Sequence, residues 1–170
     1  MSILLSKGWN LVSAPSALAD PSLKSVFTGV GDKVYHYNTG TGEWDHAVQA
    51  GPQWAGTLTT IEEGQSYWVN SLIEGRLPLE IAPKGPVAPR AIYSLISGWN
   101  MIGYSTRDIT PSKSVSSYLA SLGSKWASLY RYTPEVGFEI AKPGFGFSDL
   151  EIGRGYLIYL DSAGVLEPSP

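Results

Sequence analysis

The sequence contains no cysteine, and its 12 Lys and Arg residues are scattered without forming a run. The missing cysteines exclude disulfides, thiolate nucleophiles and cysteine-ligated metals. With a formal net charge of −3, the chain lacks the clustered basic surface that non-specific nucleic-acid binding and attraction to anionic membranes require. Charged residues make up only 16% of the chain. We therefore expect a polar but weakly charged surface and no nucleic-acid partner.

Long hydrophobic runs are also missing. No apolar stretch approaches the roughly 18 residues of a membrane-spanning helix. The opening stretch, MSILLSKGWN, has neither the basic start nor the long apolar centre of a secretory signal peptide. The sequence therefore predicts no membrane insertion and no signal peptide in this chain.

Turn-forming and aromatic residues are prominent instead, with 19 Gly, 12 Pro, 10 Tyr and 6 Trp. Three short phrases built from them occur twice, in the same order and about 90 residues apart. The pairs are Gly8–Asn10 with Gly98–Asn100, Val34–Asn38 with Leu129–Thr133, and Glu62–Asn70 with Glu151–Tyr159. Matched phrases in matched order indicate an internal duplication. The proline-rich stretch between the copies predicts a first domain at 1–83, a linker at 84–89 and a second domain at 90–170.

Each half carries the same pattern of secondary-structure signals. An apolar strand follows Gly-Trp-Asn, and a helix that starts at a proline follows the strand, with Asp20 or Thr110 as the expected N-cap. Alternating and Gly-bounded segments then predict further strands. We therefore expect a mainly β (α+β) fold of two tandem similar small domains, each with about five short antiparallel strands and one helix. Trp9, Trp99, Tyr67 and Tyr156 are expected in the cores.

A search for chemistry yields little. His36 lies between two tyrosines of an alternating strand and is expected to face solvent. Asp45 adjoins His46, but no tight turn that could carry a nucleophile is visible. The spacing of the two histidines fits no recognised metal site. Glu62 and Glu63 most simply form a solvated turn, although a glycosidase pair is assembled in space and stays open. The sequence predicts no catalytic residue, no metal and no cofactor.

Two aromatic segments, 42–54 and 142–147, differ most between the halves. Exposed rings in such segments stack on sugars or form protein interfaces. The simpler alternative is that these rings close the open end of a small β core. The predicted contact residues are Trp44, Asp45, His46, Trp54, Phe145 and Phe147.

The combined motif is Gly-Trp-Asn-Leu-Val-Ser-Ala-Pro, a proline-started helix, Tyr-x-Tyr-Asn-x-x-Thr-Gly-x-Trp and Gly-x-x-Tyr-Trp-Val. It resembles a repeat module (GWNLIS…GYW) of large secreted and surface-attached bacterial and archaeal proteins. The resemblance covers nearly the whole first half and is weaker in the second, where Tyr156-Leu157 replaces Tyr-Trp. It implies a non-catalytic accessory unit with no catalytic residues to carry over.

Such modules normally lie within long exported chains, whereas here two copies begin at a methionine. We therefore expect a non-enzymatic structural or docking protein on an external surface, most simply a phage virion component such as a capsid decoration or tail protein. Its expected partner is a protein assembly: a capsid, a tail or a surface layer. The alternative is a carbohydrate-binding or adhesion module of a secreted protein. A hydrolase with an unrecognised carboxylate site is the third reading, and a homo-oligomer stays open.

Overall fold

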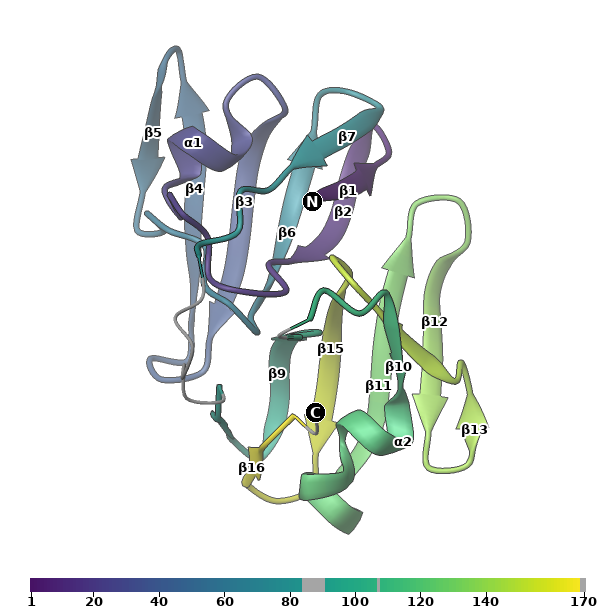
Figure 1. Ribbon diagram of the computed structural model, residues 1–170. Helices are drawn as coiled ribbons and strands as arrows, with labels where there is room; N and C mark the ends of the chain where they lie inside the picture. Colours follow the sequence, from purple (N-terminus) through teal and green to yellow (C-terminus); the bar gives the residue numbers. More distant parts are fainter. Residues whose placement is uncertain (84–90, 107, 169–170) are drawn as a thin grey trace.

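The computed structural model describes residues 1–83, 91–106 and 108–168. The fold is mainly β, as predicted, and each half of the chain contributes one five-stranded antiparallel sheet (Figure 1). The first sheet has the order β2 (Gly8–Ser13), β6 (Ser66–Ser71), β3 (Gly31–Asn38), β4 (Glu43–Ala50) and β5 (Gln53–Gly56). The second has the order β9 (Gly98–Gly103), β15 (Gly155–Leu160), β11 (Trp126–Thr133), β12 (Gly137–Lys142) and β13 (Phe145–Gly146).

Short elements cover the inner face of each sheet. In the first half they are β1 (Ser2–Leu5), paired with β7 (Gly75–Pro78), and helix α1 (Leu23–Phe27). In the second half they are β8 (Tyr93–Leu95) with β16 (Gly164–Leu166), β10 (Ser112–Ser114) with β14 (Asp149–Glu151), helix α2 (Val115–Tyr118) and the 3₁₀ helix η1 (Ala120–Lys125). The strands β1 and β8, which precede Gly-Trp-Asn, were not expected. The predicted linker at 84–89 lies outside the described residues.

The repeated Gly-Trp-Asn motif builds the turn that leads into β2 and β9. Gly8 and Gly98 both have φ +94, a conformation that glycine adopts without strain. Asn10 Nδ2 donates to the carbonyls of Ser6 and Gly8 at 2.7 and 2.8 Å, while its Oδ1 accepts from Ser6 N–H at 3.0 Å. Asn100 repeats this set of bonds with Ile96 and Gly98. The buried asparagine thus holds the turn together.

The tryptophan of the motif does not enter the core, which corrects the sequence-based expectation. Trp9 and Trp99 are 40% and 47% exposed. Side chains alternate across a strand, so an inward-facing Asn10 or Asn100 places the preceding tryptophan on the outer face. Tyr67 and Tyr156, by contrast, are 1% and 0% exposed, as predicted.

Two hydrophobic clusters fill the space between the sheets and their covers, one drawn from residues 3–79 and the other from residues 95–166. A tyrosine closes each cluster at the same place: the N–H of Glu62 donates to Tyr67 Oη at 2.8 Å, and the N–H of Glu151 donates to Tyr156 Oη at 2.7 Å. Burial raises the pKa of both phenols, so the rings stay neutral and satisfy these backbone donors.

The helices begin later than predicted. Ser22 and Ser114 are the N-caps, and their hydroxyls accept from the N–H groups of Ser25 and Ser117 at 3.3 Å in both cases. Asp20 instead accepts from Ser22 N–H at 3.0 Å. Serine and aspartate both suit a cap, and the local sequence alone does not decide between neighbouring candidates.

The two sheets meet edge to edge through matching contacts. The N–H of Ser13 donates to Gly153 O at 2.9 Å, and the N–H of Gly103 donates to Gly64 O at 2.7 Å. A Cβ added to Gly103 would lie 2.5 Å from Ser13 Cβ, and one added to Gly155 would lie 2.6 Å from Ser66 Cβ. At each contact one half supplies a serine and the other a glycine, which allows the backbones to approach.

Candidate functional site

The outer faces of the two sheets together form one aromatic surface. On β3, Val34 and His36 point into the core, so Tyr35 and Tyr37 point outward, and the same alternation applies to the neighbouring strands. We call this surface the aromatic face; it consists of Trp9, Leu11, Tyr35, Tyr37, Trp44, Trp68, Trp99, Met101, Tyr130, Tyr132, Phe138, Ile140, Leu157 and Tyr159.

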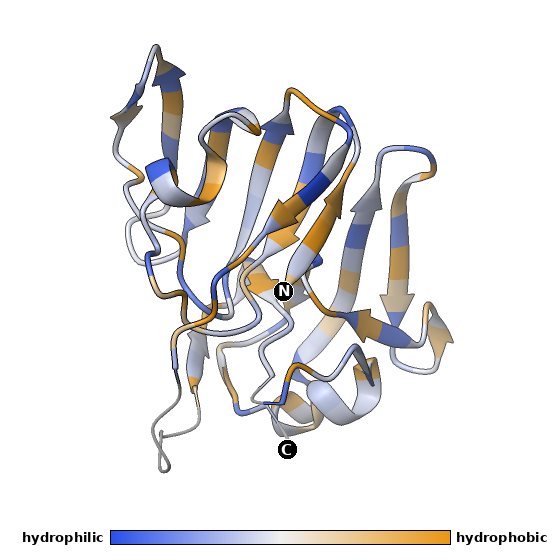
Figure 2. Cartoon of the chain, turned by 45° about the horizontal axis from the view of Figure 1, so that its top comes forward, coloured by the Kyte–Doolittle hydropathy of each residue, from blue (hydrophilic) through white to orange (hydrophobic). Residues whose placement is uncertain are grey.

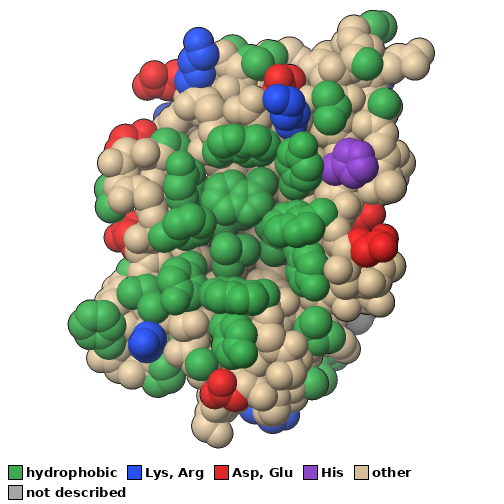
Figure 3. Space-filling model, turned by 180° about the vertical axis from the view of Figure 1, so that it is seen from behind, with side chains coloured by type: hydrophobic (Ala, Val, Ile, Leu, Met, Phe, Trp, Pro, Cys, Tyr) green, Lys and Arg blue, Asp and Glu red, His purple; other side chains and the backbone are tan. Residues whose placement is uncertain are grey.

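Figure 3 shows hydrophobic side chains gathered in a continuous band across both sheets, with charged side chains toward the margins. The hydropathy colouring in Figure 2 gives little sign of this band, because Tyr and Trp are nearly neutral on that scale. The strands there show the alternation of hydrophobic and hydrophilic residues that fills the cores. The outward side of the alternation is aromatic rather than charged, which is unusual for a sheet face in contact with water.

The rings of the aromatic face lean against one another. Trp9 lies 5.8 Å from Tyr35 with the planes tilted by 55°, and Trp99 lies 5.5 Å from Tyr130 with a tilt of 56°. Where the two sheets adjoin, Trp68 of the first contacts Tyr132 and Phe138 of the second, at 5.1 and 6.0 Å. The tilted rings fill the spaces between one another and carry the surface across the boundary between the halves.

The strand registers show that the aromatic face is itself duplicated. Tyr35 pairs with Trp68 as Tyr130 pairs with Leu157, and Tyr37 pairs with Trp44 as Tyr132 pairs with Phe138. The equivalent positions are therefore Trp9 and Trp99, Leu11 and Met101, Tyr35 and Tyr130, Tyr37 and Tyr132, Trp44 and Phe138, and Trp68 and Leu157. These six pairs are apolar or aromatic in both halves, whereas Ile140 and Tyr159 of the second half have His46 and Asn70 as their counterparts.

The six predicted contact residues are dispersed. Trp44 and His46 lie on β4 at the outer face, where Trp44 packs on Tyr37 and His46 on Tyr35. Trp54 is half-buried against Phe27 of the first core. Asp45 accepts a hydrogen bond from Asn38 at 2.9 Å.

The other two lie in the second half. Phe145 is exposed on β13, whereas Phe147 packs near the second core and lies under the guanidinium of Arg131. Sequence analysis missed most of the aromatic face. The period-two alternation along the strands, which places the repeated tyrosines and tryptophans on the outer side, was the sequence signal for this face.

His36 is buried rather than solvent-facing, which corrects the earlier expectation. Its Nδ1–H donates to Ser66 O at 2.9 Å, and burial lowers its pKa, so the ring is held neutral. A cavity of about 250 Å³ beside it is lined by Asp45 and Glu62 among other residues. Glu62 Oε2 accepts from Gln65 Nε2 at 2.8 Å. Within the described parts of the chain, no group of three or more His, Cys, Asp or Glu side chains is placed to hold a metal ion.

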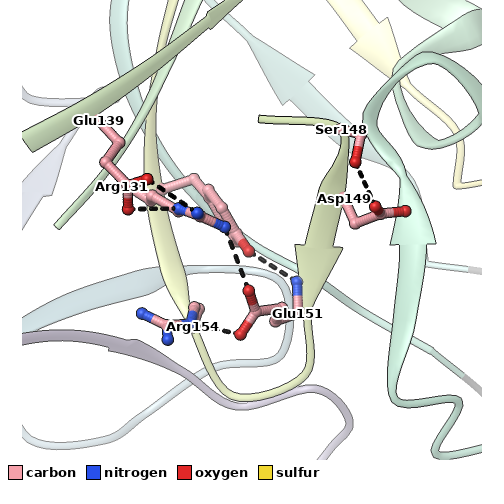
Figure 4. Close-up of polar contacts among 7 residues, drawn as sticks. Arg131, Glu139, Ser148, Asp149, Glu151 and Arg154 are labelled. Atoms are coloured by element: carbon pink, nitrogen blue, oxygen red, sulfur yellow. Dashed lines mark hydrogen bonds and ion pairs between the residues drawn. The ribbon is translucent and has the colours of Figure 1, made fainter. Parts of the chain in front are cut away.

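The position equivalent to His36 carries Arg131, which is the centre of an ion cluster (Figure 4). Arg131 donates from Nε and Nη2 to the two carboxylate oxygens of Glu139 at 2.8 and 2.9 Å, and from Nη1 to Glu151 at 3.1 Å. Arg154 Nε donates to the other oxygen of Glu151 at 2.7 Å. The hydrogen bond from Arg131 lowers the pKa of Glu139. The cluster is satisfied internally and braces one end of the second sheet.

Two clefts lie between the halves at equivalent places, and they differ in size. One, of about 850 Å³, is lined by residues of β1, β2 and the turns at 132–135 and 151–154. The other, of about 220 Å³, is lined by the equivalent residues of β8 and β9 and of the turn at 64–65. In the smaller cleft the ring of Tyr93 lies over Gly64, whereas in the larger one Ile3 lies over Gly153.

Comparison with known proteins gives no family. No protein-family model matches the chain, and neither the curated proteins nor the solved structures contain a match. The resemblance to the GWNLIS…GYW repeat module therefore stays a prediction from the sequence. Among the helices that the structure describes, none is both long and apolar enough to cross a membrane.

Proposed function

We propose that this chain is a non-enzymatic docking protein that binds one protein partner of a larger assembly through its aromatic face. The observation that carries the proposal is the continuous outward-facing band of aromatic side chains across both sheets. Contiguous apolar surface of this extent is rare on an isolated soluble protein and typical of an interface. Aromatic residues and methionine are also the types enriched at interface cores.

The size of the face fits a stable protein interface only when both sheets contribute. With strands about 4.8 Å apart and a rise of about 3.3 Å per residue, five strands of about six residues present about 480 Å². A specific interface buries about 800 Å² on each partner. One sheet falls short of this area, and two side by side exceed it. The duplication thus supplies the area that one repeat lacks.

The arrangement of the rings favours a protein over a polysaccharide. Sugars stack on ring faces that are exposed and parallel to the chain of sugar units. Here the tilts between neighbouring Trp, Tyr and Phe rings of the aromatic face run from 55° for Trp9 and Tyr35 to 77° for Trp68 and Phe138. His46 differs, since its ring is stacked on Tyr35 with a tilt of 25°. Edges and faces alternate, which gives a surface suited to interdigitation with apolar side chains. Carbohydrate binding is therefore an outcome that the experiment must separate.

The carboxyl groups support a non-enzymatic role. General acid catalysis at neutral pH uses a carboxyl whose pKa is raised. Among the described carboxyls whose pKa departs from its ordinary value, every shift is downward, and these are Asp20, Asp45, Glu135 and Glu139. Hydrogen bonds to the ionised form are the largest cause in each.

Photo-crosslinking tests the proposal. The full chain would be expressed in its native source with p-benzoylphenylalanine in place of Trp44 or Phe138, which lie at equivalent positions of the two sheets. Leu72, 48% exposed in the turn between β6 and β7, is the control position off the aromatic face. We expect both face positions to give the same discrete crosslinked protein and the control to give none. The identity of that protein also tests the prediction of a virion component.

A second measurement gives the contribution of the aromatic face to the binding free energy. Since interface hot spots contribute about 2 kcal/mol or more, Trp9→Ser or Trp99→Ser should weaken binding to the crosslinked partner about thirtyfold. Because both indoles are partly exposed, the two variants should keep the fold, and a thermal melt checks this. Crosslinks at Leu72 equal to those at the face, crosslinks only to a second copy of this chain, or glycan binding that depends on Trp9 would each overturn the proposal.

A further inference from the structure

We infer a second binding site: the larger cleft accepts an extended peptide segment of a partner protein, which adds as a strand to the open edge of β1. This site adjoins the aromatic face, with which it shares Leu11 and Tyr132, but the inference does not depend on the docking role of that face. The inference combines the hydrogen-bond phase of β1, the shape of the cleft beside it and the contrast with the smaller cleft.

The alternation of backbone hydrogen bonds along β1 leaves the edge that faces away from β7 unpaired. Met1 and Leu79 exchange two backbone bonds, of 2.9 and 2.8 Å. Hydrogen-bonded and non-hydrogen-bonded pairs alternate along antiparallel strands, and Ser2 is opposite Pro78, which has no N–H to give. The backbone groups of Ser2 and Leu4 therefore point away from β7.

Within the described residues, β1 pairs only with β7, and no backbone partner is found for Ser2 or Leu4 on the other side. An unpaired strand edge is a ready template for another chain. Peptide recognition by strand addition uses such an edge, with main-chain bonds for affinity and side-chain contacts for specificity.

The open edge borders the larger cleft rather than bulk solvent alone. Its opposite wall is formed by the turn at 132–135 and the turn at 151–154 of the second half. The hydroxyl of Ser6 donates to Glu135 Oε1 at 2.8 Å and ties the two walls together at one end. At the repeat of about 3.3 Å per residue, a strand beside the four residues of β1 would extend for about 13 Å.

The smaller cleft shows how such a site is closed. There the ring of Tyr93 fills the space above Gly64, and the volume falls from about 850 to about 220 Å³. Ile3, a shorter side chain, occupies the equivalent position of the larger cleft, over Gly153. The same scaffold thus contains one plugged edge and one open edge, which rules out the cleft being a necessary by-product of the fold.

The lining indicates the chemistry of the peptide. Ile3, Val12 and Ile152 offer apolar contacts to the side chains of the peptide. Of the charged groups of the wall, Glu151 is bonded by Arg131 and Arg154, whereas Glu135 is bonded by the neutral hydroxyl of Ser6. Glu74 and Arg76 also line the cleft, and Arg76 donates to Ser2 Oγ at 3.2 Å. The apolar part of the lining therefore suits an extended segment with apolar residues at alternate positions.

The test is selection of displayed random heptapeptides on the full chain, followed by affinity measurement with the synthetic winners. Leu4→Pro removes the outward N–H of the open edge without breaking a backbone bond to β7, at an edge position where proline is tolerated. Leu4→Ala controls for the loss of the exposed leucine side chain and should bind the peptide as the natural chain does. Ser94→Pro makes the same change at the equivalent place beside the plugged cleft. Ile3→Tyr copies the plug. We expect at least tenfold weaker binding to Leu4→Pro and Ile3→Tyr, and unchanged binding to Ser94→Pro and Trp9→Ser.

Amide hydrogen exchange provides a second readout, which needs no substituted chain. Bound peptide should slow exchange at Leu4 and leave Ser94 unchanged. The inference is overturned if no heptapeptide is enriched over the bare support, if the winners bind Leu4→Pro as tightly as the natural chain, or if bound peptide leaves exchange at Leu4 unaltered. Unchanged binding to Trp9→Ser separates this site from the aromatic face.

Discussion

The two halves of the chain share a strand order but differ at the residues through which they meet. Ser13 faces Gly103, Ser66 faces Gly155, and the plug residue Tyr93 has Ile3 as its counterpart. Six outward positions, in contrast, are apolar or aromatic in both halves. Since exposed positions are free to vary unless they contact something, the comparison separates a shared external role from divergence at the internal contact.

The ends of the two cores show a second difference. The first half holds a neutral His36 under Ser66 O, and the second places Arg131 at the same position within an ion cluster. Neutral burial and charge pairing are two solutions to the same packing problem, and they respond differently to pH. The three predictions below test the comparison, from the largest expected effect to the smallest.

The largest effect should separate the inward tyrosines from the outward tryptophans. Tyr67→Ala and Tyr156→Ala should each lower the free energy of unfolding by about 3–5 kcal/mol, because a large buried ring is lost and a backbone N–H loses its acceptor. Trp9→Ser and Trp99→Ser should each lower it by less than about 1 kcal/mol. Urea unfolding of the isolated chain measures all four variants. Equal losses of unfolding free energy in the tyrosine and tryptophan variants would contradict the assigned orientations.

An intermediate effect is expected where the sheets meet. Gly103→Ser places a second side chain against Ser13 and should lower the free energy of unfolding by about 1–3 kcal/mol, the usual range for overpacking. Ser13 Oγ donates to Arg154 O at 2.8 Å. In the exchanged double variant Ser13→Gly with Gly103→Ser, the new Cβ no longer meets the Ser13 side chain, although it still lies 2.9 Å from Gln65 O.

The exchanged variant should therefore recover at least half of the stability lost by Gly103→Ser. The double-mutant cycle, measured by urea unfolding, should give a favourable coupling between the two positions. If the stability losses of the two single variants simply add, Ser13 and Gly103 are not equivalent partners at this contact.

The smallest effect is the pH dependence of the first half. Burial lowers the pKa of His36 below its ordinary value of about 6.5, so the unfolded chain takes up the proton first as the pH falls. The free energy of unfolding should therefore decrease from about pH 7 toward pH 5. The carboxyls with lowered pKa act only below about pH 4.3.

Urea midpoints at intervals between pH 7 and 5 provide the measurement. His36→Gln can keep the bond to Ser66 O without titrating, and it should flatten the profile. His46→Gln, on the exposed face, is the matched control and should leave the slope unchanged. A slope that survives His36→Gln would assign the effect to another group.

The sequence predicted the β-rich architecture well because its signals are local and repeated. Asn10 and Asn100, the turn glycines and the alternating Tyr35–Tyr37 stretch each define a short element. The orientation of the tryptophans was predicted wrongly because the argument used residue type rather than strand phase. Val34 in the core fixes His36 inside and both tyrosines outside, and period-two alternation from that one residue would have given the aromatic face.

The clefts, the open edge of β1 and the Ser–Gly contacts could not be predicted in this way. Each depends on residues far apart in the chain, such as Ser13 with Gly103 or Ile3 with Gly153. Their approach is set by the packing of one sheet beside the other, which leaves no periodic signal. The paired phrases gave the equivalences, but only the assembled sheets show which equivalent positions touch.

The paired serines and glycines also affect how the chain is made. During synthesis the first half emerges from the ribosome before its companion exists, and neighbouring ribosomes hold many such halves close together. Two first halves would bring Ser13 against Ser13 and Ser66 against Ser66, which the close backbone approach does not accommodate. The contact therefore disfavours pairing between two unfinished chains. Once the second half follows, its covalent connection makes it the most concentrated matching partner, so each chain closes on itself.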